Sequence, residues 1–338
     1  MPHLSVTSVP WVVSGDAPAL PLDRPPEEIL SQPVADPLYD VDIFPLTLTN
    51  SRIFAFMYRA DERHLRRILP RALTLEDDVV ELWYADHPNT SMGPYLELGV
   101  TVSVSCRGDD GRTYHAGYYP YMFLTQDIPL FAGHEPYGFG KKCAYIVCLE
   151  HGGREDDGHS PPGGDYFTFV LERRGYLIHT ATGRYDDADI GPKPAFYGDP
   201  RYGRVNLRLH TDPSLRTTRW ELAYLPGTID ERLAAWIGRP EAAGGPRFML
   251  KPASIRTASP AAIRSWALQA TPFDNLGAML PVAELVGLMS FSFDLALPPA
   301  RVVWARTVER SDEDMAALAY ATPFVYTMRH RFPKPFGL

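Results

Sequence analysis

Two adjacent lysines open a segment whose residue types are typical of a strand. The segment Gly138–Cys148 predicts a strand in which Lys141 shares one face with Cys143 and Tyr145, while Lys142 lies on the other face. A buried, unpaired ammonium group is unfavourable and tends to lose its proton, and the resulting amine is a nucleophile. Catalysis by Lys141 is one interpretation of this pattern. Two solvated lysines at the beginning of a strand are the other.

Two glutamates are further candidates for chemistry. Val79 and Trp83 flank Glu81 at a distance of two residues, and its immediate neighbours are apolar as well, so either face of a strand would bury it. Burial would raise the pKa of this carboxyl group and make it suitable for proton transfer. Glu97 shares its face with more polar residues, so solvent exposure explains it as well as a place in a site does.

Arginines and histidines add weaker signals. Arg52 and Arg59 lie on either side of the first predicted strand, and either could bind a carboxylate. His87, His115 and His134 lack the spacing of metal ligands, so we predict no metal site. The chain also lacks the motifs of dinucleotide sites, phosphate-binding loops, zinc peptidases and serine hydrolases, and we predict no cofactor.

Composition excludes several classes of protein. The 338 residues include 33 Lys and Arg against 41 Asp and Glu, which gives a formal charge of −8 without any dense basic block. This argues against binding to nucleic acid or to an anionic membrane surface. No stretch has the length and apolarity of a membrane span or of a signal peptide. Three cysteines do not make a disulfide framework, and we expect a cytoplasmic protein.

The elements that must position these residues are mostly strands. Runs rich in Val, Tyr, Phe and Thr predict strands over residues 54–58, 79–85, 96–106, 115–124, 144–150, 166–172, 176–180 and 290–297. Asp61 is expected to cap a short helix that ends before Pro70, and further helices are expected over 229–236, 281–288 and from 311 to about 321. Residues 152–164 predict a polar loop. Many strands with few helices favour antiparallel sheets or a barrel.

An ordered set of segments resembles the acetoacetate decarboxylase superfamily. The segments, which together cover about residues 45–306, are Tyr58–Asp61, Gly93–Glu97, Gly133–Lys142, Leu280–Glu284 and Asp294–Val303. The resemblance implies an α+β, β-rich fold, an antiparallel β-barrel or cone with peripheral helices, and assembly into a homo-oligomer. We therefore divide the chain into a proline-rich, extended N-terminal arm (1–44), an acetoacetate decarboxylase-like catalytic domain (45–306), and a C-terminal helix and tail (307–338).

The same resemblance implies a cofactor-independent lyase that forms a Schiff base with a β-keto or 2-oxo acid. Lys141 matches the family's nucleophilic lysine, and Glu97 and Glu81 match its two catalytic carboxylates. Acetoacetate decarboxylase is itself a known example of an amine activated by a lowered pKa. Consecutive side chains of a strand point to opposite faces, so we do not expect Lys142 beside the amine of Lys141.

Four further residues are expected to contact the substrate: Arg52, His134, Tyr95 and Glu135. The family's arginine for the substrate carboxylate falls nearest Ser51, one residue before Arg52. The added segments at both ends of the chain favour a larger substrate of a biosynthetic pathway.

Two alternative functions remain open. The same lysine imine would serve an aldolase, a dehydratase or a cyclase, and fold alone does not separate these reactions from decarboxylation. The chain could also be a barrel that binds a small molecule without chemistry. In each case the expected partner is a small-molecule keto acid or ketone, and neither nucleic acid nor a membrane is expected.

Overall fold

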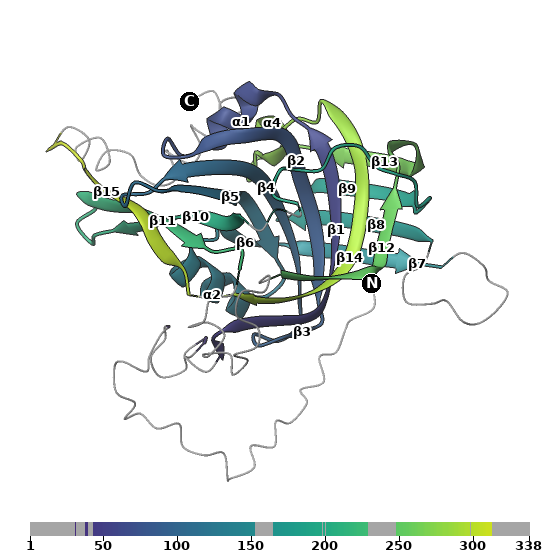
Figure 1. The fold of residues 1–338 in the computed structure, drawn as a ribbon, viewed down its shortest axis with the longest axis horizontal. Coiled ribbons are helices and arrows are strands. Elements are labelled where there is room, and N and C mark those ends of the chain that lie inside the picture. Colours follow the sequence, from purple (N-terminus) through teal and green to yellow (C-terminus); the bar gives the residue numbers. More distant parts are fainter. Residues whose placement is uncertain are drawn as a thin grey trace, which may run out of the picture. The chain divides into compact units, whose positions relative to one another are not determined.

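A computed structural model of the chain describes residues 31, 38–39, 43–152, 165–197, 199, 201–228, 248–297 and 299–312. The chain forms two compact units, Met1–Val41 and Asp42–Leu338. The strands and helices described below all belong to the second unit (Figure 1). Most of the predicted N-terminal arm, the loop at 152–164, the helix at 229–236 and the C-terminal helix and tail lie outside the described residues.

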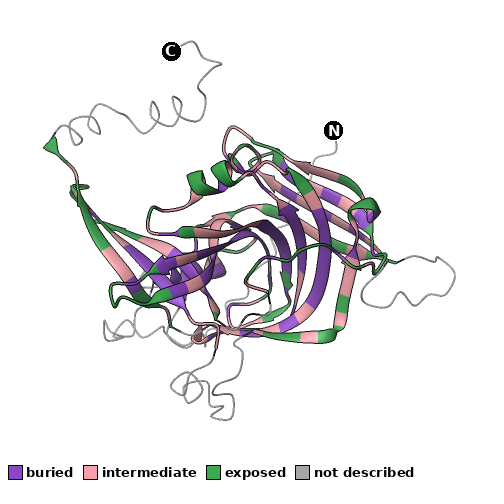
Figure 2. Ribbon diagram, turned by 45° about the horizontal axis from the view of Figure 1, so that its top comes forward, coloured by how far each residue is buried: buried purple, intermediate pink, exposed green. Residues whose placement is uncertain are grey.

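Eleven strands form one large sheet that is mostly antiparallel. Its order is β12 (Phe248–Ala258), β14 (Glu284–Leu297), β1 (Leu46–Arg59), β2 (Thr74–His87), β4 (Tyr95–Arg107), β5 (Thr113–Leu124), β10 (Tyr202–Thr211), β11 (Thr217–Leu225) and β15 (Arg301–Glu309), with β3 (Asn89–Thr90) beside β1 and β6 (Lys141–Cys143) beside β5. The parallel pairs are β5 with β10 and β5 with β6. The sheet curves strongly but does not close, since β12 and β15 are its two ends (Figure 2). The predicted β-rich, cone-like fold is confirmed.

A second, four-stranded sheet packs on one face of the first. It contains β13 (Ile263–Leu268), β9 (Tyr176–Arg184), β8 (Tyr166–Arg173) and β7 (Tyr145–His151), all antiparallel. Aromatic side chains fill the space between the sheets, where the ring of Phe56 lies 5.5 Å from that of Phe169 and 4.9 Å from that of Trp266. This is the hydrophobic core of the unit.

Strands β2 and β4 are buried on both faces. Their even-numbered residues, such as Leu82 and Leu98, belong to the core between the sheets. Their odd-numbered residues, such as Glu81 and Glu97, line a cavity on the opposite face. Both glutamates are therefore buried, although they face away from the core.

Within the described residues, four short helical segments lie around the sheets: α1 (Glu62–Ile68), α2 (Asp127–Tyr137), α4 (Leu276–Met279) and the 3₁₀ helix η4 (Pro260–Ala262). Helix α1 is confirmed, and the carboxylate of Asp61 accepts a hydrogen bond of 2.8 Å from the backbone N–H of Arg63. Helix α2 was not predicted from the sequence. It ends at Gly138, whose φ of +75° lies in the left-handed region.

Two predictions of secondary structure are wrong. The helix predicted over 281–288 gives way to β14, because this apolar run pairs with β1 on one side and β12 on the other. A short apolar run does not by itself distinguish a strand from a helix. The single strand predicted over Gly138–Cys148 is divided at Ala144: β6 belongs to the large sheet and β7 to the small one. Among the described residues, no helix has the length and apolarity needed to cross a membrane.

One close approach between β2 and β4 gives a test of this packing. Gly99 lies opposite Trp83, and a Cβ atom at Gly99 would be 2.2 Å from Cζ2 of the indole ring. The ring is held there, since its Nε1 donates a 2.8 Å hydrogen bond to Thr101. We expect Gly99→Ala to lower the free energy of unfolding by about 1–3 kcal/mol, as measured by urea denaturation.

Gly140→Ala is the matched control. A Cβ atom at Gly140 would meet nothing within 4 Å. This substitution should change the free energy of unfolding by less than about 0.5 kcal/mol. Equal effects of the two alanines would contradict the described packing of Trp83.

Candidate active site

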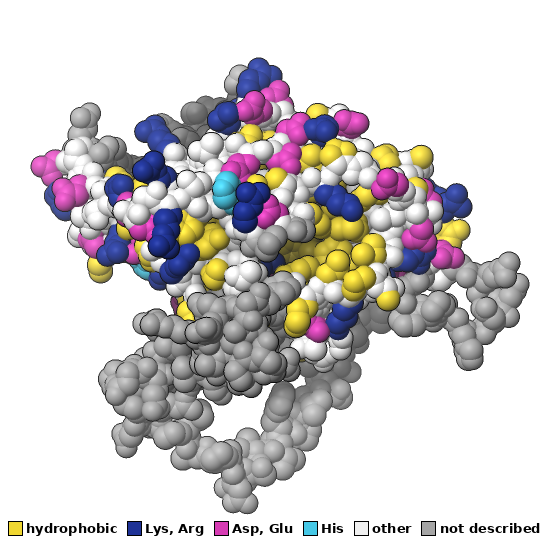
Figure 3. All heavy atoms as spheres, viewed as in Figure 1, with side chains coloured by type: hydrophobic (Ala, Val, Ile, Leu, Met, Phe, Trp, Pro, Cys, Tyr) yellow, Lys and Arg dark blue, Asp and Glu magenta, His cyan; other side chains and the backbone are white. Residues whose placement is uncertain are grey.

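The inner face of the large sheet encloses a cavity of about 570 Å³. Most of its lining is aromatic or aliphatic, and it includes Trp83, Tyr119, Phe139, Phe248, Phe291 and Phe293. Figure 3 shows apolar side chains gathered over β12 and β14, whose residues Leu250, Ile255 and Phe291 line the cavity. The polar groups within this lining are few, and each is considered below.

Lys141 brings its amine into the cavity from β6. The Nζ atom lies 2.9 Å from Oε1 of Glu97, and it donates a 3.0 Å hydrogen bond to the carbonyl oxygen of Pro129 in α2. Only 6% of the Lys141 side chain is exposed. The rings of Phe139 and Tyr95 lie 5.5 and 5.9 Å from Nζ. The amine is therefore held in an aromatic pocket by one carboxylate and one carbonyl group.

Helix α2 leaves room for this side chain at Gly133. A Cβ atom there would be 2.7 Å from Cε and 2.8 Å from Nζ of Lys141. Any larger residue at position 133 would require the amine to move. Helix α2 thus sets the path of the lysine through Gly133 and its end point through Pro129.

Glu97 is the centre of a buried polar chain. Beside its ion pair with Lys141, its Oε2 lies 3.5 Å from Nε2 of His87. Nδ1 of His87 is hydrogen-bonded to the hydroxyl of Ser51 at 2.9 Å. Burial raises the pKa of Glu97, but Lys141 and His87 together outweigh it and hold the pKa below the ordinary value. Glu97 is thus an ionised carboxylate next to the amine.

Glu81 belongs to a different part of the cavity. On β2, Glu81 lies four residues before Ala85, and Ala85 pairs with Glu97 of β4. At roughly 3.3 Å per residue, the backbones of Glu81 and Glu97 are therefore about 13 Å apart. Burial raises the pKa of Glu81 to about 7, against the hydrogen bond from the hydroxyl of Tyr197 and the charge of Arg204, which lower it. The predicted burial of Glu81 is confirmed.

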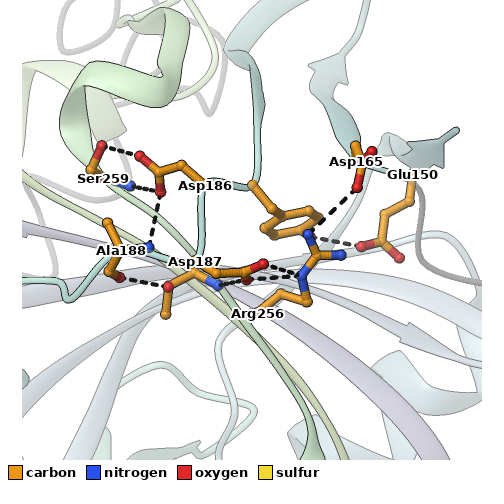
Figure 4. Close-up of polar contacts among 9 residues, drawn as sticks. Glu150, Asp165, Asp186, Asp187, Ala188, Arg256 and Ser259 are labelled. Carbon is orange, nitrogen blue, oxygen red and sulfur yellow. Dashed lines mark hydrogen bonds and ion pairs between the residues drawn. The ribbon is translucent and has the colours of Figure 1, made fainter. Parts of the chain in front are cut away.

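Arg52 does not reach the cavity. Ser51 and Arg52 point to opposite faces of β1, and Arg52 forms an ion pair with Glu150 of β7. Glu150 also accepts a 2.7 Å hydrogen bond from Tyr185, whose ring lies 4.7 Å from the guanidinium carbon of Arg256. Figure 4 shows Glu150 within this network of Arg256 and its neighbouring acidic residues. Arg52 is therefore part of a structural contact between the two sheets.

Of the other three residues expected to contact the substrate, only one lines the cavity. Tyr95 lines the cavity, but His134 and Glu135 are exposed on α2 and do not. Nδ1 of His134 is instead 3.0 Å from the carbonyl oxygen of Phe139. Lys142 points away from Lys141, as predicted, and its amine lies 2.6 Å from Asp274. The structure thus brings together Lys141, Glu97, Tyr95 and, further along the cavity, Glu81.

Six polar residues of the lining were not predicted from the sequence to belong to the site: His87, Lys193, Tyr197, Asp199, Tyr202 and Arg204. His87 could have been predicted from the alternation of side chains along a strand, because it follows Glu81 at an even spacing and therefore lies on the same face. Arg204 comes from β10, which pairs with β5 across a long connection in the sequence. No local pattern predicts that pairing.

Comparison with known proteins agrees with the fold. The family model described as acetoacetate decarboxylase (ADC) matches residues 31–238. The chain belongs to the acetoacetate decarboxylase family. It is 25% identical over 294 residues to acetoacetate decarboxylase 2 of Mesorhizobium japonicum, which covers 86% of this chain and 95% of that protein. It is 35% identical to the acetoacetate decarboxylase of Acidiphilium cryptum over 104 residues, 30% of this chain and 40% of that protein.

Solved structures of the family share the fold. Acetoacetate decarboxylase from Legionella pneumophila superposes with a TM-score of 0.57 at 21% identity, covering 77% of this chain and 88% of that one. The enduracididine biosynthesis enzyme MppR, complexed with the condensation product of pyruvate and imidazole 4-carboxaldehyde, gives a TM-score of 0.56 at 16% identity, covering 77% of this chain and 89% of that one.

Among the described residues, no cluster of three or more His, Cys, Asp or Glu is arranged to hold a metal ion.

The buried carboxyl group of Glu81 should make the stability of this family member depend on pH. Its pKa is about 7 in the folded chain against an ordinary value of 4.5. Between these values the unfolded chain has lost the proton that the folded chain retains. The free energy of unfolding therefore falls as the pH rises, by about 3 kcal/mol from this group.

The measurement is urea denaturation of the wild type and of Glu81→Gln at about pH 4.5, 6 and 8. Across this series, the free energy of unfolding of the wild type should fall by about 3 kcal/mol relative to that of Glu81→Gln. Parallel pH dependence of the two proteins would contradict the burial of an ionisable Glu81.

Proposed function

We propose that this chain is an acetoacetate decarboxylase-like lyase that forms a Schiff base between Lys141 and the carbonyl group of an oxo acid. The observation that carries the proposal is the Lys141 amine, buried within an apolar cavity and 2.9 Å from the Glu97 carboxylate. Membership of the acetoacetate decarboxylase family supports it. A carboxylate beside an amine can act as its general base, which is one way of activating a lysine nucleophile.

In the first step, Glu97 takes a proton from the ammonium group of Lys141, and the free amine attacks the carbonyl carbon of the substrate. The carbonyl oxygen leaves as water after it has received two protons, one through Glu97 and one from the nitrogen of the addition product, and the C=N⁺ iminium remains. Glu97 gives the proton that it took from Lys141 to the departing oxygen, because its carboxylate lies within hydrogen-bonding distance of the nitrogen, and that oxygen is bound to the carbon next to this nitrogen. His87 and Ser51 hold Glu97 in place from its other side.

In the second step, which requires a 3-oxo acid, the bond between the substrate carboxylate and the carbon next to the imine breaks, and its electron pair moves into the iminium. The products of this step are CO₂ and a neutral enamine. The apolar lining of the cavity favours it, because the negative charge of the carboxylate and the positive charge of the iminium disappear together. Protonation of the enamine carbon and hydrolysis by water then release the ketone and restore Lys141.

Aldol condensation or dehydration through the same iminium is the second candidate. The cavity of about 570 Å³ has the size of a site for a larger ligand, which favours a substrate bigger than acetoacetate. The structural likeness to MppR, which was solved in complex with a condensation product of pyruvate, also favours this second candidate. Analysis of the products from acetoacetate, and from pyruvate with an aldehyde, distinguishes the two reactions.

Reduction with borohydride tests the imine itself. Incubation with acetoacetate, acetopyruvate or pyruvate and then borohydride should give an irreversible adduct on Lys141, identified by peptide mass spectrometry. Lys141→Ala should give no adduct. Lys142→Ala is the matched control and should be labelled like the wild type, because the Lys142 amine binds Asp274 instead of facing the cavity.

Equal labelling of Lys141 and Lys142 would indicate nonspecific reaction and would contradict the proposal. Absence of labelling with every oxo acid, including larger aromatic ones, would favour a barrel that only binds its ligand.

Gly133→Ala tests the position of the amine. The new methyl group would lie within 3 Å of Cε and Nζ of Lys141 and displace them from Glu97 and Pro129. We expect imine trapping to slow by about tenfold to a hundredfold. Alanine is a better helix former than glycine, so α2 should persist. An unchanged trapping rate would contradict the described path of the lysine.

A further inference from the structure

The cavity contains two cations that no described carboxylate neutralises. Lys141 is paired with Glu97, and Asp199 of the lining is paired with Arg201. Arg204 and Lys193 also line the cavity, but neither forms an ion pair within the part of the chain that the structure describes. Glu81, the third carboxyl group of the lining, is kept neutral by burial below about pH 7, so positive charge exceeds negative charge within the cavity under these conditions. Such an excess attracts an anionic ligand group.

The Arg204 guanidinium is held in a defined orientation. Its Nε donates a 2.6 Å hydrogen bond to the hydroxyl of Tyr119, and its carbon lies 6.0 Å from the ring of Phe248. Because Nε is occupied, the two terminal nitrogens remain as a planar fork. Such a fork fits the two oxygens of a carboxylate.

Aromatic rings lie between Arg204 and the amine of Lys141. The ring of Phe139 is 5.5 Å from Nζ of Lys141, and its centroid is 5.4 Å from that of Tyr119, which binds Arg204. The indole of Trp83 lies 6.3 Å from the ring of Tyr119. A ligand that reaches from Lys141 to Arg204 must therefore place a flat apolar part among these rings.

We propose that Arg204 forms a second subsite that binds the carboxylate of an elongated oxo acid whose aromatic middle lies along the rings of Phe139, Tyr119 and Trp83. The oxo group of this substrate is at the opposite end and meets Lys141. The assignment of the oxo end rests on the proposed function. The carboxylate at Arg204 is remote from the imine, so it serves recognition and is not the group lost as CO₂.

The test compares two pairs of aldehydes that differ in charge. 4-Formylbenzoate and the longer 4-formylcinnamate carry the carboxylate, and their amides are neutral analogues of the same shape. The rate of cyanoborohydride trapping on Lys141 is measured against probe concentration. In the wild type, at least one acid should reach half-saturation at a concentration at least tenfold lower than its amide.

Arg204→Gln should remove most of this preference, and Arg204→Lys should restore part of it. Arg66→Gln is the charge-matched control, since it removes an arginine from the exposed side of α1. It should behave like the wild type. Equal half-saturation of acids and amides in the wild type, or an undiminished preference in Arg204→Gln, would overturn the subsite.

A binding measurement separates this inference from the proposed function. Biphenyl-4-carboxylate has no oxo group, and calorimetry should show at least tenfold weaker binding to Arg204→Gln than to the wild type. If Lys141 traps no aldehyde but this difference is found, the imine is wrong and the subsite stands. If Lys141 is trapped without any preference for a carboxylate, and binding is equal, the subsite is wrong and the imine stands.

Discussion

The ion pair between Lys141 and Glu97 is the interaction on which the rest of the site depends. Taking an ammonium and a carboxylate out of water is unfavourable unless each finds close partners, and removing one partner leaves an uncompensated charge. Three elements must therefore meet with little tolerance: β6 supplies the amine, β4 the carboxylate, and α2 the carbonyl oxygen of Pro129 and the space at Gly133. The pairing of β6 with β5, beside β4, holds the first two in register.

The double burial of β2 and β4 explains how polar groups come to lie in an apolar cavity. A strand that packs on a second sheet with its even-numbered residues must present its odd-numbered residues to the other side. In this chain that side is enclosed, so Glu81, His87 and Glu97 lose water together. Each then depends on a neighbouring polar group: Tyr197 for Glu81, Ser51 for His87, and Lys141 for Glu97. The elevated pKa of Glu81 shows that its neighbours compensate only part of the loss of water.

The sequence was sufficient where the position of a residue follows from the alternation of side chains along a single strand. It predicts the strands up to β9 that carry the glutamates, the burial of Glu81 and the divergence of Lys141 from Lys142, because each follows from alternation along one strand. It does not predict β10 to β13 or β15. It fails where position depends on distant segments. Arg52 differs from Ser51 by one residue, and only the pairing of β1 shows which of them faces the cavity. Helix α2, the interruption at Ala144 and the place of Arg204 all depend on how the large sheet curves, which no local pattern contains.

The distribution of charge within the cavity suggests how a substrate would be oriented. At the amine, Glu97 balances Lys141, so a free anion gains little there before the proposed iminium forms. At the other end, Arg204 forms no ion pair with a carboxylate of the described residues, and burial keeps the proton on Glu81 below about pH 7. An anionic group is therefore attracted to Arg204 before chemistry begins, and the opposite end of the same molecule is left at Lys141. Recognition and reaction are thereby separated by the aromatic rings between them, and the electrostatic difference between the two ends selects the orientation.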